Sequence, residues 1–502
     1  MGKQFFLLHN GIIMRIKRVQ NDFRVFEILD ESLLGKGSFH VYRATKRGLT
    51  TPEAIAILAQ EAGVEPSAVS FAGLKDKDGI TGQFLAVEGG KKVDFKDHQL
   101  TLRTIGKSPR PLETTDSDGN SFEIVLRDLT GDDMRRLRIN LAQVKAHGLP
   151  NYFDDQRFGC LRHGQGFIVR DLIRGNYEKA LKSLLAAPSP YGSDVIEGFK
   201  AGINRRWGDW KALAEFCRGR RGSSAFRHLV QEPADFSGAL HIGVSSRERT
   251  MHLFAFQSHL WNRAAGLAVK AACGDDVWWL PGDAGSLPVW EELDADARKS
   301  LASLELPLLG VGEPLNAEAK RLYGAVLRSE KISEKEFLSL DLAGFRPLAE
   351  SRSFLMEPLH LRAAPAERDE MHRQSQKMRL RFTLPRGHYA TLVCKRLAKP
   401  DDPESPVPRF FVSRHLLPWP DKEGNIQRPP RRKYQRSSRE NVSDSRGGGN
   451  RRPSRENVSD SRGGGSRRPS RRKFDGPPRR KSGNTKFRKD YGKSGPSRGS
   501  RR

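Results

Sequence analysis

The chain has 502 residues, with 88 Lys and Arg against 60 Asp and Glu, a formal charge of +28 and a pI near 10.2. This length exceeds that of an ordinary single domain, and so positive a field favours nucleic acid as the partner. No stretch approaches the roughly 18 apolar residues of a membrane span, and the apolar run within 1–18 lacks the small-residue cleavage site of a signal peptide. We therefore expect a cytoplasmic protein that binds nucleic acid and does not contact a membrane.

The first well-defined element is a helix. Thr51 can cap it, its apolar residues recur at helical spacing, and Gly63 can end it. Residues 69–72 and 83–88 have the patterns of two short strands. The segment between them, 73–79, is predicted to be a loop.

Helical and strand patterns alternate farther along the chain. Asp118-Gly119 predicts a turn into a half-buried strand, and residues 385–388 predict a turn between two strands. The alternation indicates a mixed, α+β fold class. The remaining predicted elements are helices at 131–147, 176–186 and 250–272, and strands at 379–384 and 389–397.

The charge is concentrated near the end of the sequence. Residues 421–502 hold 27 Lys and Arg against 8 Asp and Glu, which is +19 of the total +28. This segment has almost no large apolar residues, and residues 438–453 recur with one change at 454–469. Such a composition cannot bury enough surface to offset chain entropy. We predict a disordered basic tail that binds RNA non-specifically, the alternative being a solubilising linker without a partner.

Several cofactor and metal motifs are incomplete. Gly106-Lys107-Ser108 lacks the earlier Gly of a phosphate-binding loop, because Thr101 stands there. Gly310-Val311-Gly312 lacks the third Gly of a dinucleotide site. The four cysteines are scattered without a Cys-x-x-Cys pair, which argues against disulfides and zinc and fits a reducing cytosol. We expect neither a cofactor nor a metal.

The loop 73–79 contains the first candidate for chemistry. Its alternating Lys and Asp residues ordinarily form a solvated turn. However, Gly73 and Gly79 permit a close approach to a substrate, and Lys75 and Lys77 flank Asp76 and would favour its ionised form. Asp76 is therefore a candidate nucleophile.

A second candidate lies at 151–159, which reads Asn-Tyr-Phe-Asp-Asp-Gln-Arg-Phe-Gly. Aromatic, amide and Arg side chains within nine residues suit stacking on, and hydrogen bonding to, an extruded base. The alternative is a buried aromatic cluster with one ion pair.

Five blocks of residues stand out between about 21 and 397, namely Asn21-Asp22-Phe23 with Glu27, Phe71–Gln83, Asn151–Gly159, Phe256-Gln257-Ser258 with Trp261-Asn262, and Leu384–Thr391. Together they resemble the TruD family of tRNA pseudouridine synthases, and they occur in that family's order. Two positions depart from the family pattern. Asp154 stands where the family usually has Gly, which puts fine specificity in doubt, and Gly82 occupies a variable position.

The resemblance implies a pseudouridine synthase catalytic domain, with a mixed, mainly antiparallel sheet flanked by helices. It also implies an inserted α/β TRUD domain, with an RNA-binding cleft between the two. The implied division is 1–158 for the first catalytic part, 159–343 for the insertion, 344–420 for the second catalytic part and 421–502 for the tail.

The resemblance also implies the activity, which is isomerisation of uridine to pseudouridine in structured RNA, in particular at position 13 of tRNA. It implies a monomer that needs no cofactor. Asp76 would be the nucleophile or base, Phe153 would stack on the flipped uracil, and Asn151 would hold the local loop or the base edge. Electrostatic and positioning roles would fall to Lys75, Gln83 and Arg157.

Two other functions are considered. The first is a non-catalytic RNA-binding or RNA-remodelling protein that acts through its basic tail. Intact Asp76, Asn151 and Phe153 weigh against it. The second is an RNA methyltransferase, which would need a nucleotide-cofactor loop that the sequence does not contain.

Overall fold

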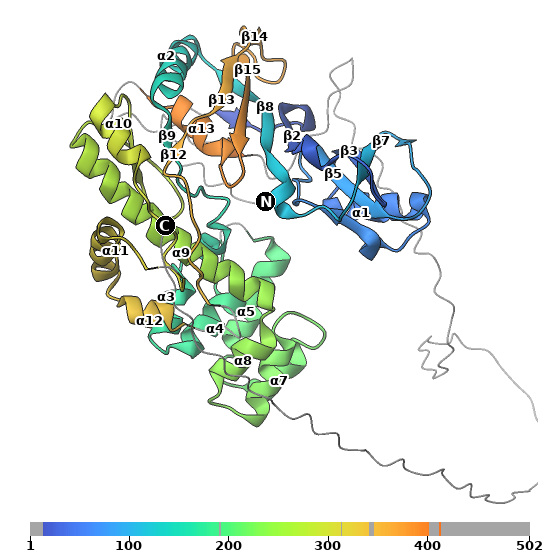
Figure 1. Ribbon diagram of the computed structural model, residues 1–502. Helices are drawn as coiled ribbons and strands as arrows, with labels where there is room; N and C mark the ends of the chain where they lie inside the picture. The colour runs from blue at the N-terminus through green and yellow to red at the C-terminus, as the bar shows by residue number, and fades with distance from the viewer. Residues whose placement is uncertain (1–13, 190–191, 313, 341–345, 401–410, 413–502) are drawn as a thin grey trace, which may run out of the picture. The chain divides into compact units, whose positions relative to one another are not determined.

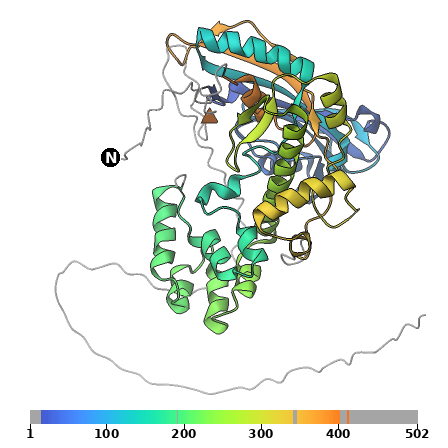
Figure 2. The same cartoon turned by 90° about the vertical axis from the view of Figure 1, so that its left-hand side faces the viewer.

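The computed structural model describes residues 14–189, 192–312, 314–340, 346–400 and 411–412 (Figures 1 and 2). Contacts divide the chain into 1–430 and 431–502, and the described residues all belong to the first unit. The predicted tail at 421–502 lies outside the described residues.

A large sheet organises the described part of the chain, where it has twelve strands. Most neighbours are antiparallel, whereas β2 and β5 pair in parallel, as do β1 and β16. This sheet confirms the predicted mixed, mainly antiparallel architecture. Along the main path the order is β13 (Leu359–Ala363), β15 (Gln376–Pro385), β8 (Ser117–Leu129), β2 (Phe23–Leu29), β5 (Ile80–Glu88), β3 (Phe39–Arg47), β7 (Leu100–Ser108) and β6 (Phe95–Lys96).

Four short strands attach to this path. β1 (Arg15–Ile16) pairs with β8 and with β16 (Phe411–Val412), β14 (Glu367–Arg368) pairs with β15, and β4 (Val69–Phe71) pairs with β5. Short 3₁₀ helices occur at Gln20–Asp22, Glu31–Leu33, Pro66–Ala68, Thr114–Asp116 and Gly159–His163.

Strand β5 is buried on both faces. Leu85 and Val87 pack into a core that includes the apolar face of α1 (Thr51–Ala62), and Phe84 and Ala86 belong to a core on the other side. Because alternate residues of a strand point to opposite faces, β5 is held between two apolar layers. The strand that follows the candidate loop is therefore central to the fold.

Helix α1 confirms the prediction with one correction at its start. The cap is Thr50, whose hydroxyl accepts a hydrogen bond from the amide of Glu53, and not Thr51. Thr51 is buried inside the first turn, where its hydroxyl has other partners, described below. The helix ends at Gly63, which is left-handed with φ of 73°.

Three predicted helices are confirmed. α2 (Gly131–His147) has the predicted bounds, and α4 (Tyr177–Ala186) starts one residue later than predicted. α9 (Ser246–Cys273) starts earlier than predicted, because Ser245 caps it through the amide of Glu248. α2 packs against α13 (Ala390–Leu397) and contacts β8 and β13 (Figures 1 and 2).

The strand predicted at 389–397 is wrong, because these residues form α13. Gly387, with φ of 76°, lies in the turn between β15 and α13. The buried residues Ala390, Val393, Cys394 and Leu397 are spaced by three and four positions, which is a helical period. The β-branched residues of the segment hid this spacing.

The turn predicted at Asp118-Gly119 is also wrong, because both residues lie within β8. Gly119 pairs with Ile28 on one side and Pro385 on the other. A Cβ on Gly119 would lie 2.3 Å from the carbonyl oxygen of Leu384. The glycine permits close approach of strands here, and not a change of chain direction.

The part of the chain between β9 (Leu149–Pro150) and β12 (Leu355–Met356) is mainly helical where it is described. β9 and β12 pair with each other, so this segment leaves and returns at neighbouring positions. It contains α4, α9, α3 (Ile168–Ile173), α5 (Asp194–Arg205), α6 (Trp210–Phe216), α7 (Ser223–Gln231), α8 (Phe236–Gly243), the hairpin β10 (Val277–Leu280) and β11 (Leu287–Trp290), α10 (Ala295–Ala302), α11 (Ala317–Glu330) and α12 (Glu334–Leu338).

All four cysteines lie in the described part of the chain, and their thiols are free. Of the helices formed by the described residues, none is both long and apolar enough to cross a membrane.

Candidate active site

Asp76 lies in the loop between β4 and β5, and its side chain is 40 % exposed. The Lys17 ammonium donates a hydrogen bond of 2.7 Å to Asp76 Oδ2 and lies 3.7 Å from the centroid of the Phe23 ring. The Lys17 side chain is only 12 % exposed. The cation that holds the candidate nucleophile thus comes from the segment after β1 and not from the loop itself.

Lys75 has a different partner. Its ammonium lies 2.5 Å from Glu27 Oε1, while Glu27 Oε2 accepts a hydrogen bond of 2.9 Å from the amide of Phe84. The Glu27 side chain is buried in β2. Lys75 therefore anchors the loop to β2, whereas the sequence suggested that it would act beside Asp76.

Gln83 reaches the loop through Thr51. The Thr51 hydroxyl donates a hydrogen bond of 2.8 Å to Gln83 Oε1 and accepts one of 3.1 Å from the amide of Lys75. Gln83 is buried in β5, so its role is to orient Thr51 and, through it, the loop.

The glycines near the loop differ in importance. A Cβ on Gly79 would lie 2.6 Å from the carbonyl oxygen of Phe23, and a Cβ on Gly82 would lie 2.7 Å from the Phe26 ring. Both positions exclude a larger residue because β2 passes close by. Gly73, by contrast, has room for a Cβ, with the Lys75 ammonium 3.7 Å away.

The second predicted group is at 151–157. Asn151 is buried, and its amide nitrogen donates hydrogen bonds to the carbonyl oxygen of Ser353 at 3.0 Å and to Ser353 Oγ at 3.2 Å. Its Oδ1 accepts a hydrogen bond of 2.9 Å from Arg352. Of the two roles predicted for Asn151, these contacts serve the first, which is to hold the local loop.

The Phe153 ring is almost fully enclosed, with 4 % of the residue exposed. It makes edge contacts with the rings of Trp261 and Tyr389. The Arg352 guanidinium lies 3.9 Å from its centroid, and that of Arg157 lies 5.2 Å away. Contact between Phe153 and a substrate base thus requires a neighbouring side chain to move.

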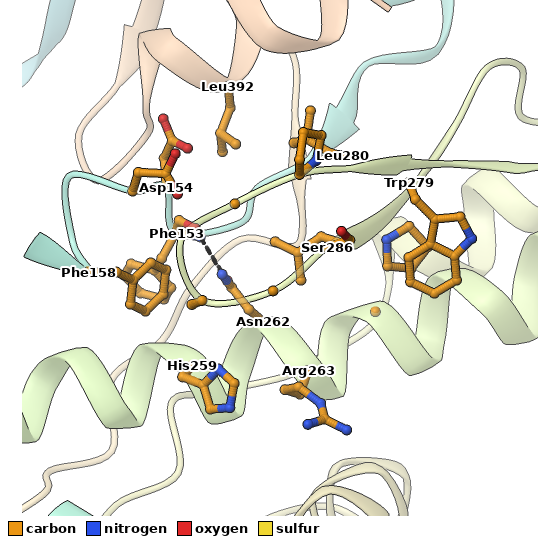
Figure 3. Close-up of a pocket in the computed structure, with 18 of the residues that line it drawn as sticks. Phe153, Asp154, Phe158, His259, Asn262, Arg263, Trp279, Leu280, Ser286 and Leu392 are labelled. Carbon is orange, nitrogen blue, oxygen red and sulfur yellow. Dashed lines mark hydrogen bonds between the residues drawn. The ribbon is translucent and has the colours of Figure 1, made fainter. Parts of the chain in front are cut away.

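Asn262 of α9 fixes the backbone at Phe153. Its Oδ1 accepts a hydrogen bond from the Phe153 amide, and its Nδ2 donates one to the Phe153 carbonyl, both 2.8 Å long (Figure 3). Gln257 and Trp261 of the same helix bind backbone carbonyls at Leu309, Leu348 and Leu306. Within this block Asn262 therefore supports the loop that bears Phe153, whereas Gln257 and Trp261 bind α9 to other segments.

A pocket of about 300 Å³ lies beside this loop (Figure 3). Its walls come from residues 153–158, from α9 and from the β10–β11 hairpin, with Leu392 of α13. Phe153 contributes to the lining, so the pocket adjoins the predicted base-contacting residue.

Arg352 is a residue that sequence reasoning missed. It donates hydrogen bonds to the carbonyls of Asn151 at 2.7 Å and Gly387 at 3.0 Å, and burial lowers its pKa to about 10. It joins the 151–157 loop to the turn before α13. It lies outside the five sequence blocks, and no local pattern marks it.

Asp154, the residue that replaces the family's usual Gly, is buried. Its carboxylate pairs with the Lys395 ammonium and accepts a hydrogen bond from the Thr391 hydroxyl, both from α13. Lys395 also lies 2.6 Å from Asp155. The extra charge is thus neutralised by α13.

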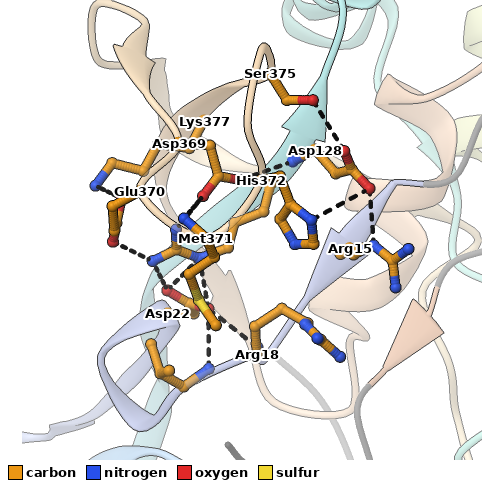
Figure 4. A network of polar contacts seen from close by, with 12 residues as sticks. Arg15, Arg18, Asp22, Asp128, Asp369, Glu370, Met371, His372, Ser375 and Lys377 are labelled. Atoms are coloured by element: carbon orange, nitrogen blue, oxygen red, sulfur yellow. Dashed lines mark hydrogen bonds and ion pairs between the residues drawn. The ribbon is translucent and has the colours of Figure 1, made fainter. Parts of the chain in front are cut away.

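A buried network supports the segment that bears Lys17 (Figure 4). Arg127 of β8 pairs with Asp22 at 2.8 Å, and Asp22 Oδ2 accepts hydrogen bonds of 3.0 Å from the amides of Arg18 and Val19. Lys17 itself is left-handed, with φ of 54°, which is unfavourable for a residue with a Cβ. The network thus braces the turn that immediately follows Lys17.

The same Arg127 pairs with Asp369 at 2.7 Å and with Glu370 at 2.9 Å. Burial would lower the pKa of Arg127, but the hydrogen bonds that it donates to Asp22 and Glu370 hold the pKa above its ordinary value. The guanidinium therefore stays charged and ties the first strands to the β14–β15 connection.

Within the described ranges, no three His, Cys, Asp or Glu side chains gather closely enough to hold a metal ion. The predicted residues instead form two polar and aromatic groups. Asp76, Lys75 and Gln83 belong to one group, and Asn151, Phe153 and Arg157 belong to the other.

Comparison with known proteins identifies this arrangement. A family model described as tRNA pseudouridine synthase D (TruD) matches residues 1–397, which places the chain among the pseudouridine synthases. Within that class, the chain belongs to the TruD family.

Individual proteins agree with this membership. The "Probable tRNA pseudouridine synthase D 1" of Methanococcus maripaludis is 28 % identical over 391 residues, covering 76 % of this chain and 99 % of the relative. The tRNA pseudouridine synthase D of Aquifex aeolicus is 28 % identical over 397 residues, covering 76 % and 98 %. A solved TruD structure from Methanosarcina mazei has a TM-score of 0.61 at 23 % identity, covering 78 % of this chain and 95 % of that one, and it shares the fold.

Proposed function

We propose that this protein converts uridine to pseudouridine in tRNA, at position 13, with Asp76 as nucleophile and without a cofactor. The observation that carries the proposal is the contact between Lys17 and Asp76. A half-exposed carboxylate with a nearly buried cation at 2.7 Å is held in place by that cation yet open to substrate. Membership of the TruD family supports tRNA as the substrate.

The reaction needs no external reagent. The bond from N1 of uracil to C1′ of ribose breaks, and a bond from C5 to C1′ forms. C5 loses a proton and N1 gains one, so the atoms and electrons balance within the nucleotide. Asp76 either attacks C1′ or assists elimination at the sugar, and in both routes it must be ionised at the start.

The second group of residues would receive the uracil. Phe153 is enclosed, so displacement of the Arg352 or Arg157 side chain would open a face of its ring to the base. Arg157 Nε is buried and has no hydrogen-bond partner among the described residues, which makes Arg157 the easier of the two to move. Asn151 would hold the loop that bears Phe153 in place while the arginine side chain moves.

The domain division predicted from the sequence is part of this proposal. Residues 1–158 and 344–420 would form the catalytic domain, and residues 159–343 the insertion. The pairing of β9 with β12 supports it, because an inserted domain must leave and re-enter its host at neighbouring positions.

We also propose that residues 421–502 increase affinity for RNA without specificity, in a cytoplasmic monomer. The support is their charge of +19. Truncation after residue 420 should weaken tRNA binding and make its dependence on salt less steep. Unchanged affinity and salt slope would show that the segment is a passive linker.

The test of the activity is pseudouridine mapping on tRNA that lacks the modification, treated with wild type, Asp76→Asn or Asp78→Asn. Asp78 is an exposed carboxylate two positions away and serves as the matched control. We expect new pseudouridine with wild type and Asp78→Asn, and none with Asp76→Asn.

Binding of tRNA should be nearly equal in all three proteins, because phosphate contacts supply most of the affinity. Activity in Asp76→Asn with loss in Asp78→Asn would assign the nucleophile to Asp78. Binding without pseudouridine in any protein would favour a non-catalytic RNA-binding role.

A further inference from the structure

Lys46 is a buried lysine directly beneath the loop that bears Asp76. It lies on β3, and 1 % of the residue is exposed. Burial of an ammonium is costly unless its donors are satisfied. Among the described residues its ammonium donates three hydrogen bonds, all to backbone carbonyls, those of Leu49 at 2.8 Å, Asp76 at 2.7 Å and Lys75 at 3.1 Å. An ammonium has three N–H donors, so this set uses all of them.

The positions of two of these carbonyls matter for Asp76. The Lys75 carbonyl belongs to the peptide plane before the Asp76 Cα, and the Asp76 carbonyl belongs to the plane after it. Each peptide unit is rigid, so holding both planes fixes the direction of the Cα–Cβ bond between them. Lys46 therefore determines where the Asp76 side chain starts, and Lys17 binds its far end.

Other contacts hold this stretch at different atoms, such as the ion pair of the Lys75 ammonium with Glu27 at 2.5 Å. The Thr51 hydroxyl accepts a hydrogen bond from the Lys75 amide at 3.1 Å, and the Thr81 hydroxyl lies 3.4 Å from the Asp76 carbonyl. The loop from 72 to 79 has neither helical nor strand pairing of its own. Among the described residues, the two carbonyls that flank the Asp76 Cα are thus held mainly by the Lys46 side chain from a neighbouring strand.

We propose that Lys46 is a positioning residue for the reaction, whose ammonium holds the two peptide units around Asp76 so that the carboxylate is aimed at the target sugar. This inference rests on the proposed function, in which Asp76 is the nucleophile. Lys46 acts through the backbone and not on the substrate.

The charge state of Lys46 gives the proposal a pH signature. Burial lowers its pKa from the ordinary 10.5 to about 8. The charged groups that face it are Asp76 and Lys75 of the loop and Glu53 of α1, of which the two carboxylates raise the pKa and Lys75 lowers it. Loss of the proton leaves two donors and a lone pair among three carbonyl oxygens, which releases at least one of them.

Stability responds in the opposite direction. Between pH 8 and 10.5 the unfolded chain binds this proton and the folded chain does not. The contribution of Lys46 to the free energy of unfolding therefore rises with pH in that window. If activity declines above pH 8 because Lys46 loses its proton, the decline is therefore not caused by unfolding of the protein.

The first experiment compares Lys46→Met and Lys46→Arg with Lys399→Met. Lys399 is a buried lysine of the same size whose ammonium pairs with Glu291 at 2.6 Å, away from the Asp76 loop. All proteins are assayed at a temperature where circular dichroism shows them fully folded. We expect Lys46→Met to lower kcat by about 100-fold, the loss typical of a misplaced catalytic group.

The KM for tRNA should change by less than about 2-fold in Lys46→Met, because phosphate contacts are untouched. Lys399→Met should unfold more readily than wild type but keep its kcat. A folded Lys46→Met with wild-type kcat would overturn the proposal, as would an equal loss of kcat in Lys399→Met.

The second experiment measures kcat and the midpoint of thermal unfolding against pH. In wild type, kcat should fall with a midpoint near pH 8, without an equal loss of stability. In Lys46→Arg the midpoint of this fall in kcat should lie at least about 1 pH unit higher, because Arg stays protonated. If neither variant folds, the wild-type profile decides. A kcat that stays constant to about pH 9.5 would overturn the proposal.

The two proposals can fail separately. Activity in Asp76→Asn would refute the nucleophile assignment and leave Lys46 nothing to position. Loss of activity in Asp76→Asn together with full activity in Lys46→Met would refute only the role of Lys46.

Discussion

The Lys17 ammonium hydrogen bonds to the Asp76 carboxylate across 59 positions of sequence, at 2.7 Å. The lysine is the more buried partner, at 12 % exposure against 40 % for the carboxylate, and the Phe23 ring lies against it. The cation is therefore fixed by packing, while the carboxylate keeps a face open to solvent and substrate.

Replacement of Lys17 should impair chemistry more than binding. In Lys17→Met the carboxylate loses the one side-chain partner that it has among the described residues, so we expect kcat to fall by about 10- to 100-fold, with the KM for tRNA nearly unchanged. Single-turnover pseudouridine formation measures the effect. Lys77→Met, which changes an exposed lysine of the same loop, is the control and should keep kcat. Equal rates in both variants would show that Lys17 does not support Asp76.

Removal of Arg127 should destabilise the fold. The change Arg127→Met leaves Asp22 and Asp369 buried without their cation, and breaking such a pair costs about 3–5 kcal/mol. Urea unfolding gives the free energy. The control is Arg381→Met, which removes a 53 % exposed arginine from an ion pair with Glu123 and should cost about 1 kcal/mol or less. A cost for Arg127→Met no larger than the control's would contradict the importance of the network.

Asp154 and Lys395 should be coupled. Lys395→Met strands a buried carboxylate and should lower the free energy of unfolding by about 3 kcal/mol. Adding Asp154→Gly, the residue usual in the family, should recover part of that loss, because the stranded charge is then removed. A coupling energy of about 0.5–3 kcal/mol in the double-mutant cycle is expected. Simple additivity of the two changes would mean that α13 does not compensate for Asp154.

Acid should weaken the contact between α9 and α11. Burial by itself would raise the pKa of Glu330, but hydrogen bonds from His259 and Arg170 lower it from 4.5 to about 2. Because the folded pKa is the lower one, the stabilisation is present above pH 4.5 and is lost as the pH falls to about 2.

Denaturant unfolding at a series of pH values tests this dependence. Glu330→Gln should be less stable than wild type at pH 7 and should lose less stability between pH 4.5 and about 2.5. Glu318→Gln changes an exposed carboxylate of the same helix and should retain most of the wild-type slope. If the free energy of unfolding of Glu330→Gln depended on pH as steeply as that of wild type, groups other than Glu330 would cause the acid sensitivity.

The sequence by itself determined the elements with strong local signals. The helix at 131–147 and the face of α1 made by Ile55, Leu58 and Ala62 follow from periodicity and caps, which act between near neighbours. The family membership likewise follows from short ordered blocks of residues. A helical spacing of buried residues was also present at 390–397, but the β-branched residues there led to the prediction of a strand instead of helix α13.

Only the tertiary structure decided which residues serve the candidate nucleophile. Lys17 and Lys46 reach Asp76 from two different parts of the sheet, and Asn262 reaches Phe153 across 109 positions. No local pattern marks Lys17 or Lys46, because each acts through a contact that depends on the path of the chain. Asn262 belongs to one of the five sequence blocks, but its contact with Phe153 follows only from the fold. The buried charges follow the same logic, since a lysine or arginine inside a protein is stable only where folding brings its acceptors together.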